Sequence, residues 1–463
     1  MDTNRRVFRS RGLQQAVAIA MACLLLVSFP RAQSPHHAKK LTKLKKIDHI
    51  IVIYQENWSF DSLYGLFPGA DGLQNAFPWI PQVSTTGVPL TKLPQPLNNG
   101  APDPRFPANL PVLPYNMARY VSASQTTGDI IHRFYHEQLQ IDGGKMDKFV
   151  SWSDNGGLVF SYIDAVDLPE GQLAQQYVLC DNFFHSAFGG SFLNHQFLIA
   201  AAPPVWPNAP ASFISAPLPD PLGGTLATLK DNQVTPDGFA INTAFSINQP
   251  HPANQVGYVP NQTNPTIGDR LSDQGISWKW YSGGWNEALA GHPDPLFQFH
   301  HQPFIYYANY ADGTAAKAEH LQDERDFLDD LSSKDLPSVS FIKPLGPDNE
   351  HPGYTNLTRG QQHVADLVAA VQSSKYWKNS VIIVTYDENG GRWDHVPPPL
   401  IDRWGPGTRV PAIIISPYAK RGFVDHTRYE TLSILKLIEE RFGLAPLSSR
   451  DANAGDLLDA FEE

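Results

Sequence analysis

Cysteine is nearly absent from this chain, which has two in 463 residues, Cys23 and Cys180. Cys23 lies in an N-terminal segment that we expect to be removed, and a single remaining thiol cannot form an intramolecular disulfide. The fold must therefore be stable on its hydrophobic core alone. Apolar residues make up 42% of the chain, as in a soluble globular protein, and the length suits one large or two ordinary domains.

Basic residues are also scarce, with 35 Lys and Arg against 46 Asp and Glu. Removal of the first 32 residues, which hold five Arg and one Asp, would take the formal net charge from −11 to −15. Such an acidic balance argues against nucleic acid and against anionic membranes as partners. The sequence has no visible internal repeat.

The N-terminus has the organisation of a secretory signal. An arginine-rich stretch precedes residues 16–29, which are apolar but too few to span a bilayer comfortably, and Ala32 offers a small residue near a cleavage point. An adjacent arginine pair also resembles a twin-arginine signal, and a membrane anchor is the alternative. We expect export to the periplasm or the extracellular space, with no stable membrane anchor. The expected divisions are a signal peptide over 1–32, a basic solvated linker over 33–46 and a folded domain over 47–463.

Short, β-branched and almost continuously apolar runs indicate buried strands of a parallel sheet. Six such runs occur, at residues 47–54, 177–180, 276–281, 338–342, 381–386 and 412–415. Helices are expected over residues 361–373 and from a capping box of Thr427 and Glu430 to Gly443. This alternation predicts an α/β fold, a three-layer α/β/α sandwich with a mostly parallel central sheet.

Two segments rich in Pro, Asn and Gly, residues 80–118 and 203–265, show little periodicity. We expect them to be long ordered loops that form a lobe over the active site, because loop excursions of this kind often shape a substrate cleft.

Two of the predicted strands end in oxygen-rich pairs. Glu56 and Asn57 follow the first strand, and Asp387 and Glu388 follow the strand at 381–386. Ligands bind just outside the carboxyl ends of strands in open α/β sheets, so both pairs should reach the same edge. Adjacent carboxylates repel each other, and a bound cation is a natural reason to hold them together. Oxygen ligands favour Mg²⁺, Ca²⁺ or Mn²⁺ and are also compatible with Zn²⁺.

A serine and several histidines add to this pattern. Ser191 follows two glycines and could sit on a sharp exposed turn, where a base or a metal would have to activate it; an ordinary turn serine is the alternative. His132 and His136 are four residues apart and would share one helical face, but no glutamate of a zinc-binding HExxH motif stands between them. His301 lies in an aromatic loop, and His351 follows the predicted strand at 338–342. Imidazoles beside a metal can bind phosphoryl oxygens and protonate a leaving alkoxide, whereas a structural role is the alternative for each.

Seven segments in a shared order carry a resemblance to one family. They are residues 56–61, 67–69, 143–147, 181–184, 350–352, 385–388 and 394–398. On these motifs the chain resembles the bacterial phosphoesterases that unite phospholipases C and secreted acid phosphatases, which have an alkaline-phosphatase-like α/β/α core. The motifs span most of the expected domain, and their order makes the match specific.

The resemblance implies a site and a mechanism. A divalent metal would be held by Glu56, Asn57, Ser191, Asp387 and Glu388. Ser191 would attack phosphorus in line and form a phosphoseryl intermediate that water hydrolyses, with charge on the oxygens stabilised by the metal and by the pocket histidines. Those histidines would be His132, His301 and His351, one of them the general acid. Trp58 and Asn389 replace a common arginine and a common histidine of the family, and because neither is an implied ligand they bear on substrate preference.

Residues 134–138 and 300–304 look closer to the acid-phosphatase branch. We therefore expect a secreted metal-dependent phosphomonoesterase that acts on a small phosphorylated substrate. A phospholipase C that hydrolyses phosphatidylcholine-type phosphodiesters is the near alternative, with a phospholipid head group as its ligand. An exported binding protein, in which Trp278, Trp280 and Trp285 stack on sugars or choline-like groups, is the alternative from another class.

Overall fold

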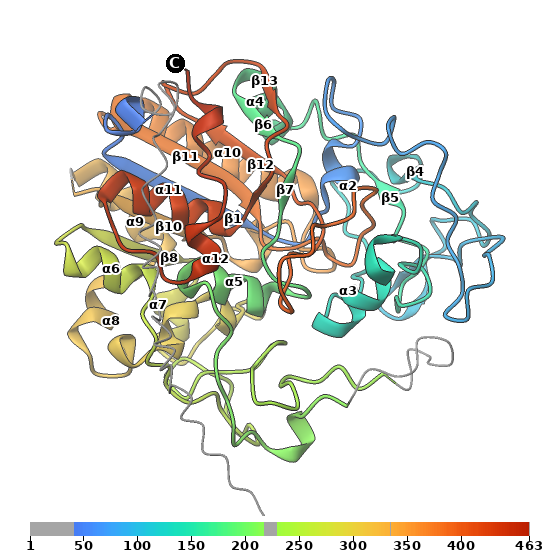
Figure 1. The fold of residues 1–463 in the computed structure, drawn as a ribbon, viewed down its shortest axis with the longest axis horizontal. Coiled ribbons are helices and arrows are strands. Elements are labelled where there is room, and N and C mark those ends of the chain that lie inside the picture. The colour runs from blue at the N-terminus through green and yellow to red at the C-terminus, as the bar shows by residue number, and fades with distance from the viewer. Residues whose placement is uncertain (1–40, 217–228, 334, 463) are drawn as a thin grey trace, which may run out of the picture.

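The computed structural model describes residues 41–216, 229–333 and 335–462, and the expected signal peptide lies outside them. Eight strands form one sheet in the order β13-β6-β12-β11-β1-β10-β8-β9 (Figure 1). Every neighbouring pair is parallel except the two that involve β12, which is antiparallel to both β11 and β6. The predicted α/β class with a mostly parallel central sheet is confirmed.

All six predicted strands are present, each within two residues of its predicted bounds. Their near-continuous apolar sequences suit a sheet that is covered on both faces. The sheet consists of β1 (His49–Gln55), β6 (Val178–Cys180), β8 (Trp278–Ser282), β9 (Leu321–Asp323), β10 (Val339–Lys343), β11 (Ser380–Tyr386), β12 (Ala412–Ile415) and β13 (Phe423–Asp425). Short two-stranded ladders pair β2 (Leu97–Asn98) with β3 (Ala101–Pro102), β4 (Tyr115–Asn116) with β5 (Ser161–Tyr162), and β7 (Phe183–Phe184) with β14 (Tyr429–Glu430).

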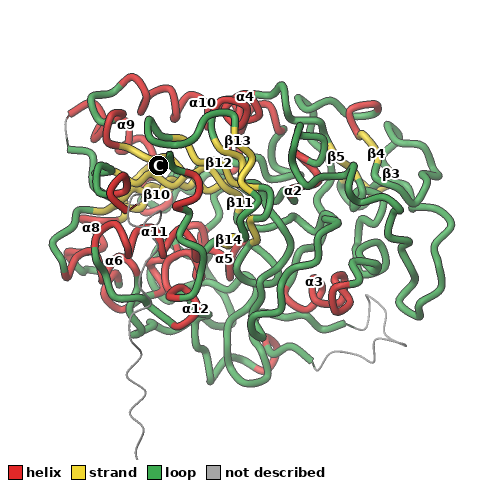
Figure 2. Tube along the Cα trace, turned by 45° about the horizontal axis from the view of Figure 1, so that its top comes forward, coloured by secondary structure: helices red, strands yellow, loops and turns green. Residues whose placement is uncertain are grey.

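Helices cover both faces of the sheet (Figure 2). One layer contains α4 (Pro169–Gln176), α9 (Glu324–Ser333) and α10 (Leu357–Ser373). The other contains α5 (Ser191–Ala200), α6 (Ile267–Asp273), α8 (Ala315–His320), α11 (Leu432–Phe442) and α12 (Ser449–Ala452). Three further helices are α2 (Phe60–Tyr64), α3 (Phe134–Ile141) and α7 (Trp285–Leu289). The layers are those of the predicted sandwich, and α10 begins four residues before the predicted helix.

The predicted capping box of Thr427 and Glu430 is wrong. Glu430 belongs to β14, which pairs with β7, and its carboxylate accepts a hydrogen bond from Arg450 at 2.8 Å. The helix α11 begins only after Thr431, because the tertiary pairing of β14 holds the preceding residues extended. Its end is as predicted, with Gly443 in the left-handed region at φ 68°.

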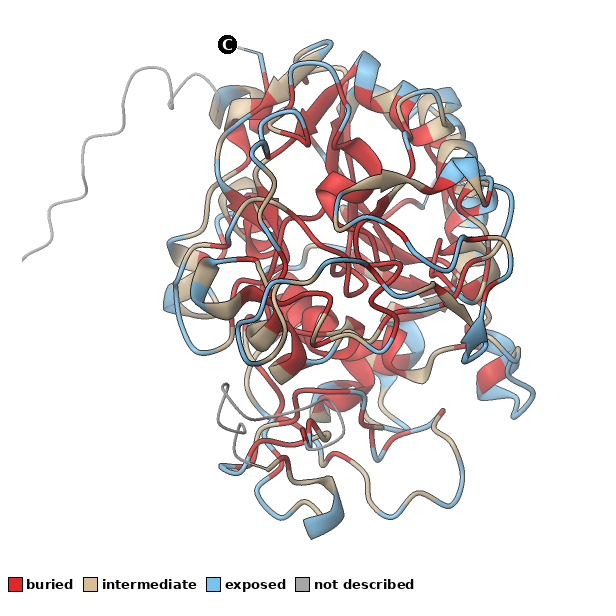
Figure 3. Ribbon diagram, turned by 90° about the vertical axis from the view of Figure 1, so that its right-hand side faces the viewer, coloured by how far each residue is buried: buried red, intermediate tan, exposed pale blue. Residues whose placement is uncertain are grey.

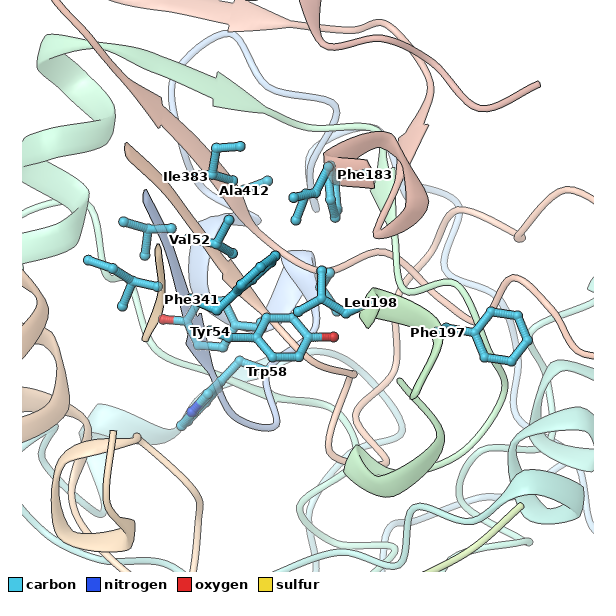
Figure 4. Packing of buried hydrophobic residues seen from close by; sticks show 14 of the residues in the cluster. Val52, Tyr54, Trp58, Phe183, Phe197, Leu198, Phe341, Ile383 and Ala412 are labelled. Atoms are coloured by element: carbon cyan, nitrogen blue, oxygen red, sulfur yellow. The ribbon is translucent and has the colours of Figure 1, made fainter. Parts of the chain in front are cut away.

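Side chains from neighbouring strands form the centre of the core. Val52 of β1 lies opposite Phe341 of β10 on one side and Ile383 of β11 on the other. Figure 4 shows these side chains together with Leu198 of α5, and Figure 3 shows the buried residues gathered in the sheet and in the helices next to it. Cys180, the one cysteine of the described residues, is a buried free thiol on β6.

The two long loops and the end of the expected linker lie in different places relative to the cavity and the core. Residues 203–265 supply three residues to the main cavity, whereas none of its lining residues comes from 80–118. The last residues of the expected linker are not a solvated spacer, because Leu44 is buried against the core. Within the described ranges no helix combines the length and apolar character needed to cross a bilayer.

Candidate active site

The two oxygen-rich pairs lie side by side at one edge of the sheet. β1 and β11 are parallel neighbours, and their last residues, Gln55 and Tyr386, lie opposite each other. The backbone N–H of Asp387 donates to the carbonyl of Gln55 at 3.0 Å. The register of the sheet therefore places the residues that follow each strand next to each other, as the rule for carboxyl ends of strands requires.

The backbone after β1 turns sharply to bring Asn57 into this edge. Asn57 has φ 67°, a left-handed conformation that asparagine tolerates better than most residues. Its N–H donates to Asp387 Oδ1 at 3.2 Å. Gly390 lies against the same turn, and a Cβ atom at Gly390 would come within 2.4 Å of the Asn57 carbonyl oxygen. The glycine after the second acidic pair thus permits the close approach of the two segments.

Several side-chain oxygens converge between these segments. The hydroxyl of Ser191 donates to Glu56 Oε2 at 3.1 Å. One terminal atom of the Asn57 carboxamide lies 3.2 Å from Glu56 Oε2 and 2.5 Å from Glu388 Oε1. If this atom is Nδ2, it donates hydrogen bonds to both carboxylates. If it is Oδ1, three oxygen atoms face one another, and only a cation bound between them would make the arrangement favourable. Asp387 Oδ2 is buried without a hydrogen-bond partner, so the donor set fits a divalent metal with oxygen ligands.

The three carboxylates have different electrostatic surroundings. Burial raises the pKa of Asp387 to about 7, and the charge of Glu56 adds to that effect. Burial and the charge of Asp387 raise the pKa of Glu388 well above its ordinary value. Burial alone would also raise the pKa of Glu56, but His301 and Lys343 lower it well below its usual range. Burial and mutual repulsion thus favour the protonated forms of Asp387 and Glu388 in the absence of a cation, and a bound cation would favour their ionised forms.

Lys343 was not expected from the sequence. It is the last residue of β10, it is fully buried, and its ammonium forms an ion pair with Glu56 Oε1. The signal that could have identified it is its position, because it directly follows the predicted strand at 338–342 and thus reaches the same edge of the sheet.

Ser191 is the first residue of α5, where the positive end of the helix dipole favours negative charge. The turn before it is held by a buried carboxylate. Glu137 Oε2 accepts from the N–H of Gly189 at 2.6 Å, and Oε1 accepts from the N–H of Thr408 at 3.0 Å. His185 Nε2 lies 2.9 Å from the same Oε1. Glu137 therefore ties the turn to two other parts of the chain.

Two further features hold this turn. Gly189 has φ 85°, and a Cβ atom there would lie 2.4 Å from the backbone nitrogen of Phe134. The side chain of Asn194, on the first turn of α5, accepts from the N–H of Ala187 and donates to its carbonyl, both at 3.0 Å. The position of Ser191 is thus set by buried polar contacts on both sides of the turn.

We expect Glu137→Gln to lower kcat by about 10²-fold with little change in KM, because loss of the charged acceptor would displace the Ser191 hydroxyl, the nucleophile that the family resemblance implies. Steady-state kinetics on a phosphate ester would measure both constants. Glu439→Gln is the matched control. It changes a different buried glutamate, which lies on α11, and should keep kcat near the wild-type value. An unchanged kcat in Glu137→Gln would contradict a positioning role.

The three histidines implied by the family resemblance all line one cavity. His351 Nδ1 donates to the carbonyl of Pro352 at 2.6 Å, and the ring stacks on Tyr354 with centroids 3.8 Å apart. His132 Nδ1 faces the carbonyl of Ile130 at 2.5 Å. Because a carbonyl only accepts, both rings have Nδ1 protonated and present Nε2 towards Asn57.

His301 differs from these two. Its Nε2 lies 2.9 Å from Glu56 Oε1, and burial lowers its pKa to about 4 although Glu56 opposes the shift. The neighbouring His300 also lines the cavity, and burial lowers its pKa well below the ordinary value. Burial thus favours the neutral form of both rings. The family resemblance implied only His301, but the structure brings His300 to the site as well.

Two expectations from the sequence are wrong. His132 and His136 do not share a helical face, because α3 begins after Arg133 and His132 lies in the extended segment before it. His136 is on α3 and contacts Asp231 at 2.9 Å, outside the cavity lining. Trp278, Trp280 and Trp285 do not form a binding surface, because all three are buried in the core.

The cavity in front of Ser191 has a volume of about 370 Å³. It is lined largely by polar side chains that come from loops: Asp129, Arg133, Asp154, Gln233, Asn242, Thr243 and Gln298. Asp387 and Glu388 lie beneath this surface, fully buried. The cavity thus offers a polar entrance above a deep cluster of oxygen ligands.

Sequence comparisons point to enzymes that cleave phosphate esters. A family model described as the phosphoesterase family matches residues 47–445, nearly the segment over which the motifs indicated the resemblance. Phospholipase C B of Mycobacterium tuberculosis is 25% identical over 459 residues, which cover 90% of this chain and 78% of that protein. Non-hemolytic phospholipase C of Pseudomonas aeruginosa is 24% identical over 90% of this chain and 57% of that protein.

A plant protein and a solved structure are also similar. Non-specific phospholipase C6 of Arabidopsis thaliana is 31% identical over 166 residues, which cover 29% of this chain and 32% of that protein. A phosphonate monoester hydrolase from Silicibacter pomeroyi aligns over 60% of this chain and 69% of its own, with 11% identity and a TM-score of 0.31.

Proposed function

Since this chain belongs to the phosphoesterase family and is a phosphoric-ester hydrolase, we propose that it is a metal-dependent phosphomonoesterase with Ser191 as its nucleophile. The alternative of a non-enzymatic binding protein is wrong, because the family is one of hydrolases and the tryptophans that would form its binding surface are buried. The substrate proposed is a small, polar phosphate ester of the kind that acid phosphatases cleave.

The observation that carries the monoester proposal is the cavity. Its volume of about 370 Å³ is at the small end of ligand sites, and most of its lining is polar. Gln233, Thr243 and Gln298 line it with polar side chains that can bind hydroxyl or carbonyl groups of a leaving alcohol. A diacylglycerol would instead require a large apolar surface.

The mechanism follows from the positions of the side chains. Glu56, Asn57, Ser191, Asp387 and Glu388 would hold the metal, which would supply a lowered pKa for the serine hydroxyl and a positive charge for the phosphoryl oxygens. Ser191 Oγ attacks phosphorus opposite the leaving oxygen and forms a phosphoseryl ester. The Ser191 hydroxyl donates a hydrogen bond to Glu56 Oε2, so its proton passes to Glu56 as Oγ attacks and returns to Oγ when water cleaves the phosphoseryl ester. Water then attacks the phosphoseryl group and releases inorganic phosphate.

His132 and His351 are suited to contact the phosphoryl group, because each presents Nε2 next to Asn57 at the cavity floor. One of them would donate a proton to the leaving alkoxide. His301 would instead orient Glu56 through its contact with Oε1. This division explains why a ring with a pKa of about 4 lies in the site without serving as the acid.

We expect His351→Ala to slow alkyl phosphates far more than nitrophenyl phosphate, by about 10²-fold or more, because a good leaving group needs little proton assistance. The two substrates are compared in the same variant, so a general loss of active protein would lower both kcat/KM values equally and would not change their ratio. Equal losses would assign His351 to positioning, and the same measurement on His132→Ala would then identify the acid.

Phospholipase C activity is the second candidate, because the relatives from Mycobacterium tuberculosis and Pseudomonas aeruginosa bear that name. The experiment that separates the two is turnover of nitrophenyl phosphate, bis-nitrophenyl phosphate and phosphatidylcholine, each with and without chelator. We expect the monoester to be cleaved fastest and chelator to abolish turnover. Preference for phosphatidylcholine would establish the phospholipase instead.

We also propose that the protein is exported by residues 1–32, on the basis of the N-terminal sequence. Determination of the N-terminal sequence of the protein recovered from periplasm or medium would test this, with cleavage near Ala32 as the expected result.

A further inference from the structure

Two buried glutamates lie behind the turn that carries His351. Glu350 directly precedes that histidine, and Glu170 lies on the first turn of α4. The hydroxyl oxygen of Tyr386, the last residue of β11, lies 3.0 Å from Glu170 Oε2 and 2.8 Å from Glu350 Oε2. Neither glutamate lines the cavity, so neither takes part in the proposed chemistry.

The contacts of Tyr386 require a proton on one of the two carboxyl groups. A phenol has a single O–H, so it can donate its hydrogen to only one of the two carboxyl oxygens. The contact with the other oxygen is favourable only if that carboxyl group is protonated and donates to the phenol oxygen. Glu170 is the better place for this proton, because its Oε1 is buried without a partner among the described residues, whereas Glu350 Oε1 accepts from Gln55 Nε2 at 3.1 Å.

The surroundings of the pair favour the same state. The side chains that face the two carboxyl groups are two phenols and two carboxamides, none of them a cation: Tyr64 of α2, Tyr386, Gln55 and Gln361 of α10. Burial and the charge of Glu350 raise the pKa of Glu170 well above its ordinary value, and burial raises the pKa of Glu350 to about 7. The pair therefore keeps one proton at neutral pH and loses it as the pH rises further.

Glu350 also holds the backbone that presents His351 to the cavity. Its φ of 71° is in the left-handed region, which a residue of this kind keeps only where its surroundings enforce it. The carbonyl of Glu350 accepts from Trp58 Nε1 at 3.1 Å, and its side chain fills the space that a Cβ atom at Gly360 would need. His351 Nε2 lies 2.9 Å from the carboxamide of Asn57. The carboxyl pair thus fixes one end of a strained turn, and the ring of His351 lies at the other end.

We propose that Glu170 and Glu350 share one proton, and that this proton holds the turn from which His351 reaches the phosphoryl group. Both glutamates are positioning residues, because neither reaches the substrate. Loss of the proton to solvent leaves two buried negative charges that repel each other, which displaces Glu350 and with it His351. The inference rests on the proposed function for the role of His351 and extends it to the control of that residue by pH.

The test compares the pH profiles of kcat in metal-loaded wild type, Glu170→Gln and Glu439→Gln, with nitrophenyl phosphate as the substrate. In Glu170→Gln an amide hydrogen that does not titrate replaces the shared proton, so the variant should retain kcat at alkaline pH where the wild type loses it. One pH unit above the wild-type midpoint, the ratio of variant to wild-type kcat should have risen about tenfold from its value at neutral pH. Groups that titrate in the cavity are the same in all three proteins and do not change this ratio.

Glu439→Gln is the matched control, because burial also raises the pKa of Glu439, to about 9, and this residue lies on α11. Its profile should follow that of the wild type. A Glu170→Gln profile parallel to the wild-type profile would overturn the inference.

Infrared spectroscopy of the metal-loaded proteins detects the proton without any assay of activity. The difference spectrum between wild type and Glu170→Gln at neutral pH should contain the carbonyl band of one protonated carboxyl group, and its absence would reject the shared proton. Glu350→Ala should lower kcat by about 10²-fold at every pH, and Glu350→Gln, which keeps the hydrogen bonds, should recover most of that loss. If Glu170→Gln does not fold, Glu350→Gln serves for both the pH profile and the infrared spectrum.

These outcomes separate the two proposals. A wild type that prefers bis-nitrophenyl phosphate or phosphatidylcholine would reject the proposed phosphomonoesterase. The same pH comparison on the preferred substrate, together with the infrared band, would still decide the role of the carboxyl pair.

Discussion

Replacement of Ser191 by alanine is expected to lower kcat by about 10³–10⁶-fold, the usual cost of losing a nucleophile. The hydroxyl is the donor to Glu56 Oε2 at 3.1 Å, at the start of α5 and on the cavity floor. Among the described side chains lining the cavity, Thr243 also carries an aliphatic hydroxyl, but it belongs to the loop of residues 203–265 rather than to the oxygen cluster. Because Ser191 is also one of the proposed metal ligands, the metal content of the variant should be measured together with its kcat.

Rapid quench with labelled substrate gives the direct evidence. Phosphate should appear on Ser191 of the wild type within one turnover and should be absent from the alanine variant. Ser191→Thr retains the hydroxyl and is the matched variant, expected to recover a measurable part of the activity. If phosphate never appears on the protein and Ser191→Ala turns over normally, attack by water on the substrate becomes the mechanism.

Removal of the metal, or of the Asp387 carboxylate, should have the next largest effect. We expect Asp387→Asn to weaken metal binding and to lower kcat/KM by at least about 10²-fold. Burial raises the pKa of Asp387 to about 7 in the metal-free fold, so metal must displace a proton below that pH. The apparent metal affinity of the wild type should therefore rise as pH increases through about 7, and calorimetric titration at several pH values would measure it.

The same shift has a consequence for stability with a definite sign. A carboxyl group whose pKa is raised on folding binds more protons in the native than in the unfolded state, so the metal-free protein should lose stability as pH rises from about 4 to about 7. The loss is of the order of a few kcal/mol. Asp387→Asn should remove this part of the pH dependence, whereas Asp425→Asn, at the buried end of β13, should not. Unfolding in chelator across this pH range measures it, and an unchanged profile in Asp387→Asn would contradict the argument.

Local patterns in the sequence were enough to predict the strands that build the site. β1 and β11 are near-continuous apolar runs, and such runs form buried parallel strands in any protein with helices on both faces of its sheet. Because the carboxyl ends of parallel strands meet at one edge, the pairs Glu56-Asn57 and Asp387-Glu388 could be placed together from the sequence. The side chains of these pairs offer oxygen atoms, which are suitable ligands for a divalent cation, so a metal site could be predicted as well.

Predictions that depended on spacing alone were less secure. The four-residue spacing of His132 and His136 indicated one helical face, but the helix begins after Arg133 because the preceding residues are held extended by contacts with Asp154 and Ile130. Thr427 and Glu430 matched a capping box, but pairing of β14 with β7 prevailed. Local propensity differs between such states by about 1 kcal/mol, and tertiary contacts readily exceed it.

The electrostatic partners of the site could be found only in the folded molecule. Lys343 contacts Glu56 although the two residues lie more than half the length of the chain apart, and the carboxylate of Glu137 contacts Gly189 although no local sequence pattern predicts this. Such contacts arise where distant segments pack, and they carry no periodicity or spacing of their own. The strands and the oxygen-bearing residues at their ends follow from local physical chemistry. The charges that shift the pKa values of Glu56, Asp387 and Glu388, and the contacts of Glu137 that hold the turn before Ser191, are consequences of tertiary packing.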